Sequence, residues 1–461
     1  MKARLPAKEL KYALTGLAKG IDRKASLPVL QGIRIETTRD TVRFTATDLD
    51  STVSYTGLSA QAQKPGVAVI ADVARLKELV AQATNDEVEI TSLDETTVQV
   101  SLHGSLGDRT CTLTGIDPVE WPADPPRVAT KPADIPFAEL YRSLVTFSSR
   151  DQSRYVLNGI YVEAKDGNHT LVATDGRRLT AVNSIHLPLP SSVVLPYSKF
   201  LCWPQLDGTC SMGISKDGWF RLETGPWSFA CKLVDGTYPN WRQVVPSTAA
   251  DNRLVLADTD IPILDDAIRT LPRGDGDNQP LTLMRHGKSL CVAAKENGKD
   301  GWQYRELTAS RLDGLPISVN RQYFHEAVRV GFREFSWQDD KSPLLGKTNN
   351  GIHVLMPLRS EAPPPKPKSF TVTPSPVVTA TPEEKPPMIE RKREPETPTD
   401  QAGMEQLQLA FQTVRDRVRD LNAAISELGD HIRSVKKQDK AVKTELDNAR
   451  GVLAKLQSIS L

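Results

Sequence analysis

The chain has 461 residues, a formal net charge of +1 and an apolar content of 39%. At roughly 150 residues per domain, this length predicts about three domains. The near-zero net charge excludes a protein whose whole surface is basic, so any surface for nucleic acid would have to be a local patch balanced by acidic surface elsewhere.

The five cysteines form no CxxC pair and have no histidine partners at ligand spacing. This pattern argues against a zinc site or a disulfide framework and favours a reducing compartment. The start of the chain lacks the apolar core of a secretory signal, and no run is long and apolar enough to span a bilayer. We therefore expect a cytoplasmic protein without metal or other cofactors.

A weak internal repeat with a period of roughly 120 residues runs through the first 360 residues. Each unit is predicted to open with a proline-led amphipathic helix, at residues 5–10, 135–140 and 261–266. A second helix is predicted later in each unit, at residues 72–80, 197–201 and 320–328.

Strands are predicted between and after these helices. Residues 45–48 (TATD) recur as residues 172–175 (VATD), and residues 291–294 (CVAA) hold a fainter copy. Residues 88–91 and 97–101 alternate apolar and polar side chains, as half-buried strands do. Each unit is thus two halves of a helix followed by strands, which predicts an α+β fold with helices on one face of antiparallel sheets.

The stretch from Arg154 to Leu179 is the most informative part of the repeat. Residues 154–163 and 171–179 are predicted to be strands. Asp166-Gly167 between them has the chemistry of a hairpin turn, because glycine accepts the positive φ that such turns need. From the pattern alone, this stretch is an ordinary hairpin with an exposed basic tip at Arg177 and Arg178.

Several segments resemble the bacterial DNA polymerase III beta subunit, the beta sliding clamp family. The segments YVLNG (155–159) and ATDGRRL (173–179) are similar to its "YxLNG" and "ATDGxRL" strands. Residues 23–30 resemble its basic loop and "LPIL" strand. Residues 229–241 resemble its "KLVDGxFPDY" segment, and residues 354–359 its closing "VMPMR".

The resemblance implies three tandem clamp domains, at residues 1–126, 127–250 and 251–360, with sheets outside and helices lining the inside. Two chains would join head to tail in a homodimer ring around double-stranded DNA, bound without regard to sequence. The implied function is that of a DNA replication processivity factor, which tethers a DNA polymerase and is placed on DNA by a clamp loader. The residues of the dimer interface stay open, with Ile268 and Leu271 as candidates.

Typical clamps lack the segment that follows. Residues 361–402 are rich in proline, threonine, lysine and glutamate, which predicts a disordered linker. Residues 403–461 predict a coiled-coil helix, because apolar residues keep heptad spacing from Met404 to Leu456 with one acidic interruption at Asp439. Self-association through this tail is therefore expected.

No catalytic constellation is evident, so an enzyme is not expected. Gly346-Lys347-Thr348 lacks the earlier glycine that a P-loop requires, since position 341 is lysine. DNA contact would be electrostatic, because duplex DNA carries one charge per ~1.7 Å and a sliding ring needs no base readout. The candidate DNA-binding residues are Lys8, Lys11, Lys19, Arg23, Lys24, Arg142, Arg150, Arg154, Tyr155 and Lys199. Solvated helix faces would explain the same charges.

The resemblance also implies a pocket in which partner proteins insert a short peptide between the second and third domains. The matching residues are Leu157, Thr174, Gly176, Arg177, Arg178, Leu179, Pro239, Val244, Val354, Leu355, Met356, Pro357, Leu358 and Arg359. The apolar members would form a slot, methionine would adapt to varied ligands, and Arg178 and Arg359 would hold peptide carbonyls or an acid. Any one apolar member could instead simply fill the core.

In the tail, Gln406, Leu407, Leu409 and Phe411 resemble the Gln-Leu-x-Leu-x-Phe peptide used by clamp partners. Leu407 and Phe411 are also heptad positions, so chance explains the match as well. Two alternatives to a clamp stay open: a clamp-derived scaffold that recruits partners through the coiled coil without encircling DNA, and an enzyme that uses the fold as a platform.

Overall fold

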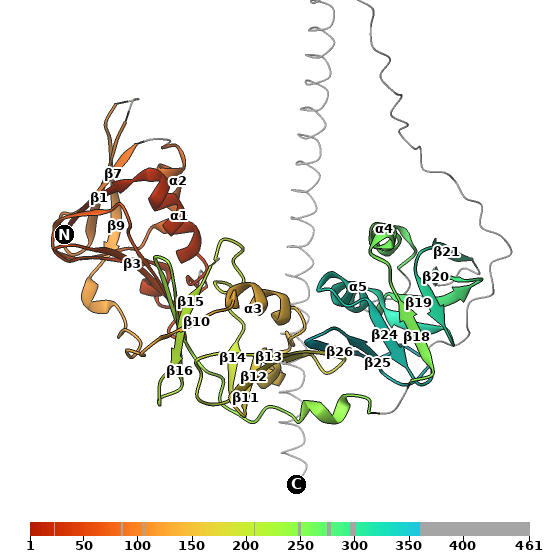
Figure 1. The fold of residues 1–461 in the computed structure, drawn as a ribbon. Coiled ribbons are helices and arrows are strands. Elements are labelled where there is room, and N and C mark those ends of the chain that lie inside the picture. The colour runs from red at the N-terminus through yellow and green to blue at the C-terminus, as the bar shows by residue number, and fades with distance from the viewer. Residues whose placement is uncertain are drawn as a thin grey trace, which may run out of the picture. The chain divides into compact units, whose positions relative to one another are not determined.

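The computed structural model describes residues 1–22, 24–83, 86–104, 107–206, 208–247, 250–273, 278–295 and 301–359 (Figure 1). The predicted linker at 361–402 and coiled-coil helix at 403–461 lie outside these residues. So do Arg23 and the tail residues Gln406, Leu407, Leu409 and Phe411.

The elements follow the three repeats. The first repeat contains β1 (Lys2–Pro6), α1 (Ala7–Leu17), η1 (Pro28–Gln31), β2 (Ile33–Thr37), β3 (Val42–Thr47), β4 (Ser51–Thr56), β5 (Gln61–Lys64), β6 (Gly66–Ile70), α2 (Val73–Ala81), β7 (Glu87–Ser92), β8 (Thr97–His103), β9 (Arg109–Ile116) and η2 (Pro118–Glu120). The second contains β10 (Lys131–Ala133), α3 (Phe137–Val145), η3 (Gln152–Leu157), β11 (Gly159–Lys165), β12 (Asn168–Thr174), β13 (Arg178–Ile185), β14 (Val193–Pro196), β15 (Cys210–Ile214), β16 (Trp219–Thr224), β17 (Trp227–Lys232) and η4 (Trp241–Val244). The third contains β18 (Asn252–Val255), η5 (Asp258–Asp260), α4 (Ile261–Thr270), β19 (Pro280–His286), β20 (Ser289–Lys295), β21 (Trp302–Leu307), β22 (Arg311–Asp313), β23 (Ile317–Asn320), α5 (Arg321–Arg329), β24 (Glu334–Trp337), β25 (Leu344–Lys347) and β26 (Gly351–Leu355).

The proline-led helices are confirmed as α1, α3 and α4. Pro6 and Pro136 occupy the N-cap positions of α1 and α3, and Pro262 lies in the first turn of α4. Proline suits these places because the N–H groups of the first turn have no acceptor within the helix, so the N–H that proline lacks is not needed there. The buried residues of α1 include Leu10, Leu14 and Leu17, whose spacing turns one apolar stripe toward the sheet.

Strand pairs in the described part are antiparallel and form sheets of 13, nine and four strands. The largest sheet crosses from the first repeat into the second where β4 pairs with β17, and the nine-stranded sheet joins the second repeat to the third where β13 pairs with β26. These two ladders, which we call the first and second seams, leave no unpaired strand edge between repeats. The predicted α+β fold with antiparallel sheets is thereby confirmed.

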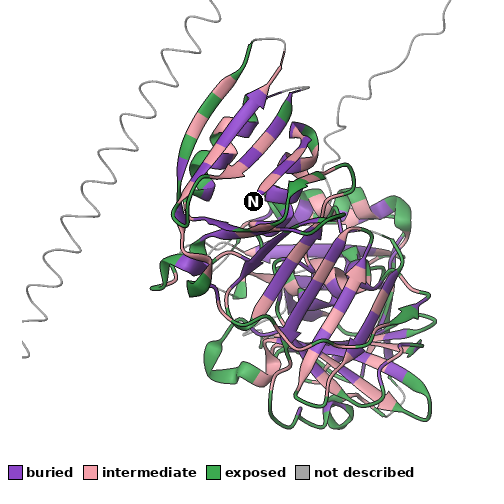
Figure 2. Cartoon of the chain, turned by 90° about the vertical axis from the view of Figure 1, so that its left-hand side faces the viewer, coloured by how far each residue is buried: buried purple, intermediate pink, exposed green. Residues whose placement is uncertain are grey.

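The core follows the same division. One buried apolar cluster runs from Met1 to Cys231, a second fills the third repeat from Leu254 to Leu355, and a smaller one lies at the second seam. Figure 2 shows buried residues concentrated along the strands and exposed residues at the turns. The predicted hairpin turn is present, with positive φ of 51° at Asp166 and 76° at Gly167, as a two-residue turn of this kind requires.

Three sequence-based assignments were wrong. Residues 152–157 form a 3-10 turn instead of the start of a strand, because the Asp151 carboxylate accepts from the Ser153 N–H at 3.0 Å and begins a turn there. Residues 197–201 do not form a helix: turns occupy residues 199–202, and Pro204 disfavours helical backbone at the residue before it. Residues 28–31 form η1 instead of a strand, with Pro28 fixing its first turn.

The two candidate residues for a dimer interface, Ile268 and Leu271, do not lie at the surface. Both are buried in the core of the third repeat, with 7% and 2% of their surface exposed. The buried guanidinium of Arg321 donates to the carbonyl oxygens of both residues, at 3.2 and 2.9 Å. The end of α4 is therefore held inside the protein.

Candidate functional site

The residues predicted to bind a partner peptide come together at the second seam. Pairing of β13 with β26 sets Arg178 opposite Leu355 and Leu179 opposite Val354, although the two strands are far apart in sequence. The backbone N–H of Met356 then donates to the carbonyl oxygen of Arg177 at 3.0 Å and continues the ladder past the strand end. The closing segment 354–359 is thus fixed beside the tip of the second-repeat hairpin.

One face of this seam carries a buried apolar group that we call the seam cluster. It consists of Val172, Leu179, Ala181, Val194, Tyr238, Trp241, Leu345 and Val354, with Leu157 half-buried against it. Leu179 and Val354 therefore form a floor. Leu355 faces the other way, into the core of the third repeat, because successive strand residues point to opposite sides. A direct contact between Leu355 and a partner peptide is thus ruled out.

A cavity of about 480 Å³ lies next to the seam cluster. Its walls include Val244, Val245, Trp337, Leu345 and Met356. Val244 and Met356 are 52% and 45% exposed, which is unusual for apolar side chains beside a buried cluster. A concave apolar surface of this size is suited to a few side chains of an extended peptide.

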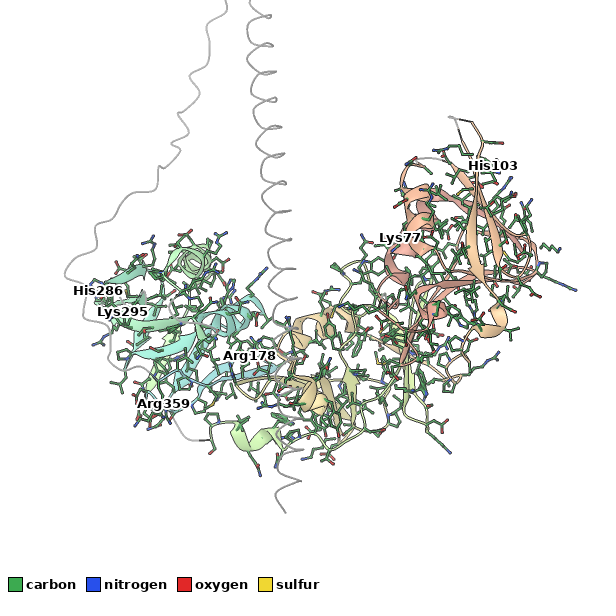
Figure 3. The ribbon with its side chains drawn as sticks, turned by 180° about the vertical axis from the view of Figure 1, so that it is seen from behind. Lys77, His103, Arg178, His286, Lys295 and Arg359 are labelled. Carbon is green, nitrogen blue, oxygen red and sulfur yellow. The ribbon has the colours of Figure 1, made fainter. Side chains whose placement is uncertain are left out.

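The remaining predicted pocket residues surround this region in different ways. Pro239 and Arg359 are exposed, while Pro357 and Leu358 are half-buried. Leu358 is fixed by its N–H, which donates to the carbonyl oxygen of Ser318 at 2.8 Å. Figure 3 shows Arg359 at the end of the described chain. The residues predicted from the sequence therefore include parts of the floor, the wall and the rim of this pocket.

The turn at the hairpin tip is held by its own side chains. Thr174 Oγ1 donates to the carbonyl oxygen of Arg178 at 2.6 Å and accepts from the N–H of Gly176 at 3.1 Å. The Asp175 carboxylate accepts from the N–H groups of Arg177 and Arg178, at 2.9 and 3.0 Å. Gly176 has φ of +84°, a conformation that other residues rarely adopt. The exposed Arg177 side chain is thus presented from a rigid turn.

Arg178 does not have the predicted role. Its side chain is 6% exposed, and its guanidinium pairs with Asp175 at 3.1 Å, with Glu326 of α5, and with the carbonyl oxygen of Thr146 at 2.9 Å. It also lies 4.1 Å from the Tyr323 ring centre. These donors are already used, so Arg178 ties the hairpin to α5 and is unable to hold a peptide.

Sequence reasoning missed several residues of the site. Tyr238, Trp241, Val245, Trp337 and Leu345 all belong to the seam cluster or the cavity walls. The indole N–H groups of Trp241 and Trp337 are buried and have no acceptor among the described residues. The aromatic pair at 238 and 241 was a usable signal, because large rings near a predicted pocket are common anchors.

The candidate DNA-binding residues are mostly exposed. Lys8, Lys19, Lys24, Arg150, Arg154 and Lys199 all have exposed side chains, and Tyr155 is 57% exposed. Arg154 lies 3.8 Å from Asp151 and also donates weakly to the carbonyl oxygen of Asp175. These residues are available to phosphate groups.

Lys11 and Arg142 are engaged within the protein. The Lys11 ammonium donates to the carbonyl oxygens of Ala81, at 3.1 Å, and of Ala83, and so closes the end of α2. Arg142 is half-buried and donates to the carbonyl oxygen of Trp203 at 2.9 Å. Lys11 therefore has a structural role, because its ammonium group donates to carbonyl oxygens at the helix end that have no partner within the helix.

No group of three or more metal-ligating side chains occurs in the described part of the chain, and no helix there has the length and apolar character to cross a membrane. Burial raises the pKa of the Cys202 thiol to about 11 and that of Cys291 to about 12. These thiols are thus poor nucleophiles near neutral pH.

Comparison with known proteins places this geometry in a family. Residues 1–123 match the family model of the DNA polymerase III beta subunit N-terminal domain, and residues 137–240 match that of its central domain. The beta sliding clamp of Pseudomonas aeruginosa is 26% identical over 356 residues, which cover 74% of this chain and 94% of the relative. The beta sliding clamp of Caulobacter vibrioides is 26% identical over 385 residues, covering 78% and 100%.

Solved structures agree with the sequence relatives. The sliding clamp of Bacillus subtilis superposes with a TM-score of 0.67 at 20% identity, covering 78% of this chain and 99% of that one. The Pseudomonas aeruginosa clamp bound to griselimycin gives 0.67 at 21% identity, covering 78% and 100%. The two domain matches, the nearly full-length relatives and the shared fold lead to one conclusion: this chain belongs to the DNA polymerase III beta subunit family, the beta sliding clamps.

Proposed function

We propose that this protein is a DNA sliding clamp, a ring of two copies that encircles duplex DNA and tethers a polymerase to it. The observation that carries the proposal is the match to beta sliding clamps along 94–100% of their length, on three repeats joined by continuous β-ladders. Clamp domains at residues 1–126, 127–250 and 251–360 are part of the proposal. It involves no catalysis and no cofactor.

Contact with DNA would be electrostatic and independent of sequence. Lys8, Lys19, Lys24, Arg150 and Lys199 are exposed and spread over the first two repeats. Phosphate contacts of this kind position a duplex without reading its bases, so the ring would be free to slide. The chain's net charge of +1 is compatible with such a local surface.

Partners would bind at the second seam. An extended peptide with apolar side chains would cover the exposed Val244 and Met356 over the floor of Leu179 and Val354. Arg177 and Arg359 are exposed at the rim and would pair with acidic groups of the peptide. A polymerase and a clamp loader are the expected partners, and both would compete for the same surface.

Topological binding separates a clamp from other DNA-binding proteins. The protein should be loaded on nicked circular duplex by a bacterial clamp loader, isolated by gel filtration in about 0.15 M salt, and then challenged with a restriction enzyme that linearises the circle. A clamp stays with the circle and slides off the linear product. The proposal would be overturned if the circle and the linear product retained the protein equally, or if neither retained it at that salt concentration.

The heptad pattern from Met404 to Leu456 favours a second candidate, a clamp-derived scaffold that recruits partners through this tail without encircling DNA. Sedimentation equilibrium of the full chain and of a chain ending at residue 402 separates the two functions. A clamp keeps a dimer mass without the tail. A scaffold assembled by its tail becomes a monomer.

Gln406, Leu407, Leu409 and Phe411 suggest regulation of the pocket by the tail. If this segment occupies the pocket of its own or a neighbouring chain, the linker gives it a high effective concentration. Deletion of residues 404–461 should then tighten the binding of a partner peptide. Unchanged affinity would exclude this regulation while leaving the clamp function intact.

A further inference from the structure

A second cavity lies at the first seam, on the face of the sheet that α1 does not cover. Phe44, Ala46, Val53 and Tyr55 of β3 and β4 face the apolar core under α1. Because strand residues alternate, the intervening residues Thr45, Thr52 and Ser54 face the other side. They line a cavity of about 680 Å³ together with β16, β17 and the segment that joins the first two repeats.

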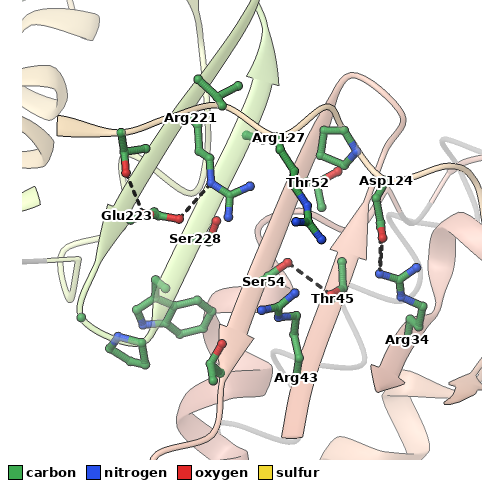
Figure 4. Close-up of a pocket in the computed structure, with 18 of the residues that line it drawn as sticks. Arg34, Arg43, Thr45, Thr52, Ser54, Asp124, Arg127, Arg221, Glu223 and Ser228 are labelled. Carbon is green, nitrogen blue, oxygen red and sulfur yellow. Dashed lines mark hydrogen bonds and ion pairs between the residues drawn. The ribbon is translucent and has the colours of Figure 1, made fainter. Parts of the chain in front are cut away.

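Arginine dominates the walls of this cavity (Figure 4). Arg34, Arg43, Arg127 and Arg221 line it, against the carboxylates of Asp124 and Glu223 alone, so its ionisable lining carries a net charge of +2. In the figure, the side chains of Arg43, Arg127 and Arg221 point toward one another across the cavity. A concave surface with surplus positive charge attracts anions.

Two of the arginines have carboxylate partners. Arg34 pairs with Asp124 at 2.7 Å, and Arg221 pairs with Glu223 at 2.9 Å. Arg43 and Arg127 form no ion pair or side-chain hydrogen bond within the described part of the chain, and both have exposed side chains. These two guanidinium groups are therefore the ones available to a ligand, each with donors spaced for two oxygens of one anion.

The floor of the cavity supplies further donors. The register sets Thr45 opposite Ser54 and Ser54 opposite Ser228, which gives a row of hydroxyls across three strands. Thr45 and Ser54 are 3.2 Å apart through their hydroxyl oxygens. Hydroxyls between guanidinium groups are a frequent environment for phosphate oxygens.

The connecting segment is fixed over this floor at two points. Asp124 bonds Arg34 through both carboxylate oxygens, at 2.7 and 2.9 Å, and the Thr130 hydroxyl donates to Glu223 at 2.9 Å. The Arg34 guanidinium also lies 5.4 Å from the ring centre of Trp121. The acidic groups thus hold the segment in place, and they leave Arg43 and Arg127 unopposed.

We propose that this cavity binds a small phosphate ester of nucleotide size. A terminal phosphate carries a charge of about −1.5 to −2 near neutral pH, which matches the surplus of +2. The volume exceeds the needs of a phosphate alone and falls in the usual range of small-molecule sites. Pro226 and Val128 line the cavity and give it an apolar part for the organic group. This site is distinct from the peptide pocket, and its occupancy requires no DNA.

Calorimetric titration of the full chain with pyrophosphate, ADP, adenosine and sulfate tests the proposal. ADP and pyrophosphate should bind, and adenosine should not. Arg43→Gln/Arg127→Gln should weaken ADP binding by at least ~10-fold, since each guanidinium contributes charge-assisted hydrogen bonds. Arg39→Gln, which removes one positive charge from the exposed turn between β2 and β3, should bind ADP as the unchanged protein does.

Several outcomes would overturn the proposal. They are no heat with ADP or pyrophosphate at millimolar concentration, equal binding of sulfate, binding of adenosine as tight as that of ADP, or undiminished binding in the double variant. Thermal unfolding of the double variant checks that both exposed side chains are dispensable to the fold. If that variant unfolds early, Ser228→Ala replaces it, with a loss of several-fold in ADP affinity expected.

Discussion

Both seams join two repeats by an antiparallel β-ladder, but the polar and the apolar face of the sheet are exchanged between them. At the first seam, the helix side is aromatic, with Tyr12, Tyr55, Trp203 and Trp227 packed together, and the other side is the arginine-lined cavity. At the second seam, the helix side holds the charged Arg178, and the other side is the apolar seam cluster. A β-ladder joins repeats in both cases, so the side chains on the free face are open to different ligands.

The contrast also concerns how each seam is stabilised. The first depends on burial of rings, which is favourable without matched partners. The second depends on a buried cation that needs each of its acceptors, and losing one partner leaves the other charge unpaired. Four predictions test this difference, and they follow in order of the expected effect.

Trp227→Ala should be the most destabilising change. Its ring is 3% exposed, lies 4.7 Å from that of Tyr55, and donates from Nε1 to the Tyr12 hydroxyl at 3.1 Å. Loss of such a ring should lower the free energy of unfolding by about 3–5 kcal/mol, measured by urea denaturation followed by circular dichroism. The matched control, Trp219→Ala, removes a half-exposed indole from the neighbouring strand. An equal loss in both variants would contradict a special role of the first seam.

Arg178→Met should lower the free energy of unfolding by about 3 kcal/mol, because it leaves Glu326 and Asp175 without their cation in a largely buried place. The same urea titration measures it. Arg177→Met removes an equal charge from the exposed turn and should change stability by less than ~0.5 kcal/mol. Equal free energies of unfolding in the two variants would contradict the structural role of Arg178.

His353 makes the second seam sensitive to acid. Burial, followed by the charge of Arg178, lowers the pKa of His353 to about 3 in the folded protein. The unfolded chain binds a proton near pH 6.5, so stability is full above that pH and is lost as the pH falls from about 6.5 toward 3. At pH 5 the loss should be up to ~2 kcal/mol relative to pH 7. His353→Gln should flatten this difference, and an unchanged pH profile would refute it.

Val244→Ser and Met356→Ser should have the smallest effect on the fold and a selective effect on binding. Both side chains are about half exposed, so stability should change by less than ~0.5 kcal/mol. Together they should weaken binding of a Gln-Leu-x-Leu-x-Phe peptide roughly tenfold, as fluorescence anisotropy would measure. Val330→Ser removes a similarly exposed valine elsewhere in the third repeat and should leave peptide affinity unchanged. Equal weakening by the control would place the peptide elsewhere.

Much of this fold could be predicted from local patterns. Proline before an apolar stripe located α1, α3 and α4, and Asp166-Gly167 located a hairpin turn whose two φ angles are positive. These features depend on residues close in sequence, so spacing alone reveals them. The same local reasoning failed at residues 152–157 and 197–201, where an aspartate cap and a following proline outweighed the apolar pattern.

The sequence by itself determined the repeats, the helix starts and the family of this chain, because those depend on periodicity and on short motifs. Only the tertiary structure decided which residues do what at the seams. Arg177 and Arg178 are neighbours of the same type, yet Arg177 is exposed and Arg178, at the start of β13, is buried against α5. Arg43 and Arg221 come from different repeats and meet only because β4 pairs with β17. Burial and long-range strand pairing assign these roles, and no local pattern encodes either one.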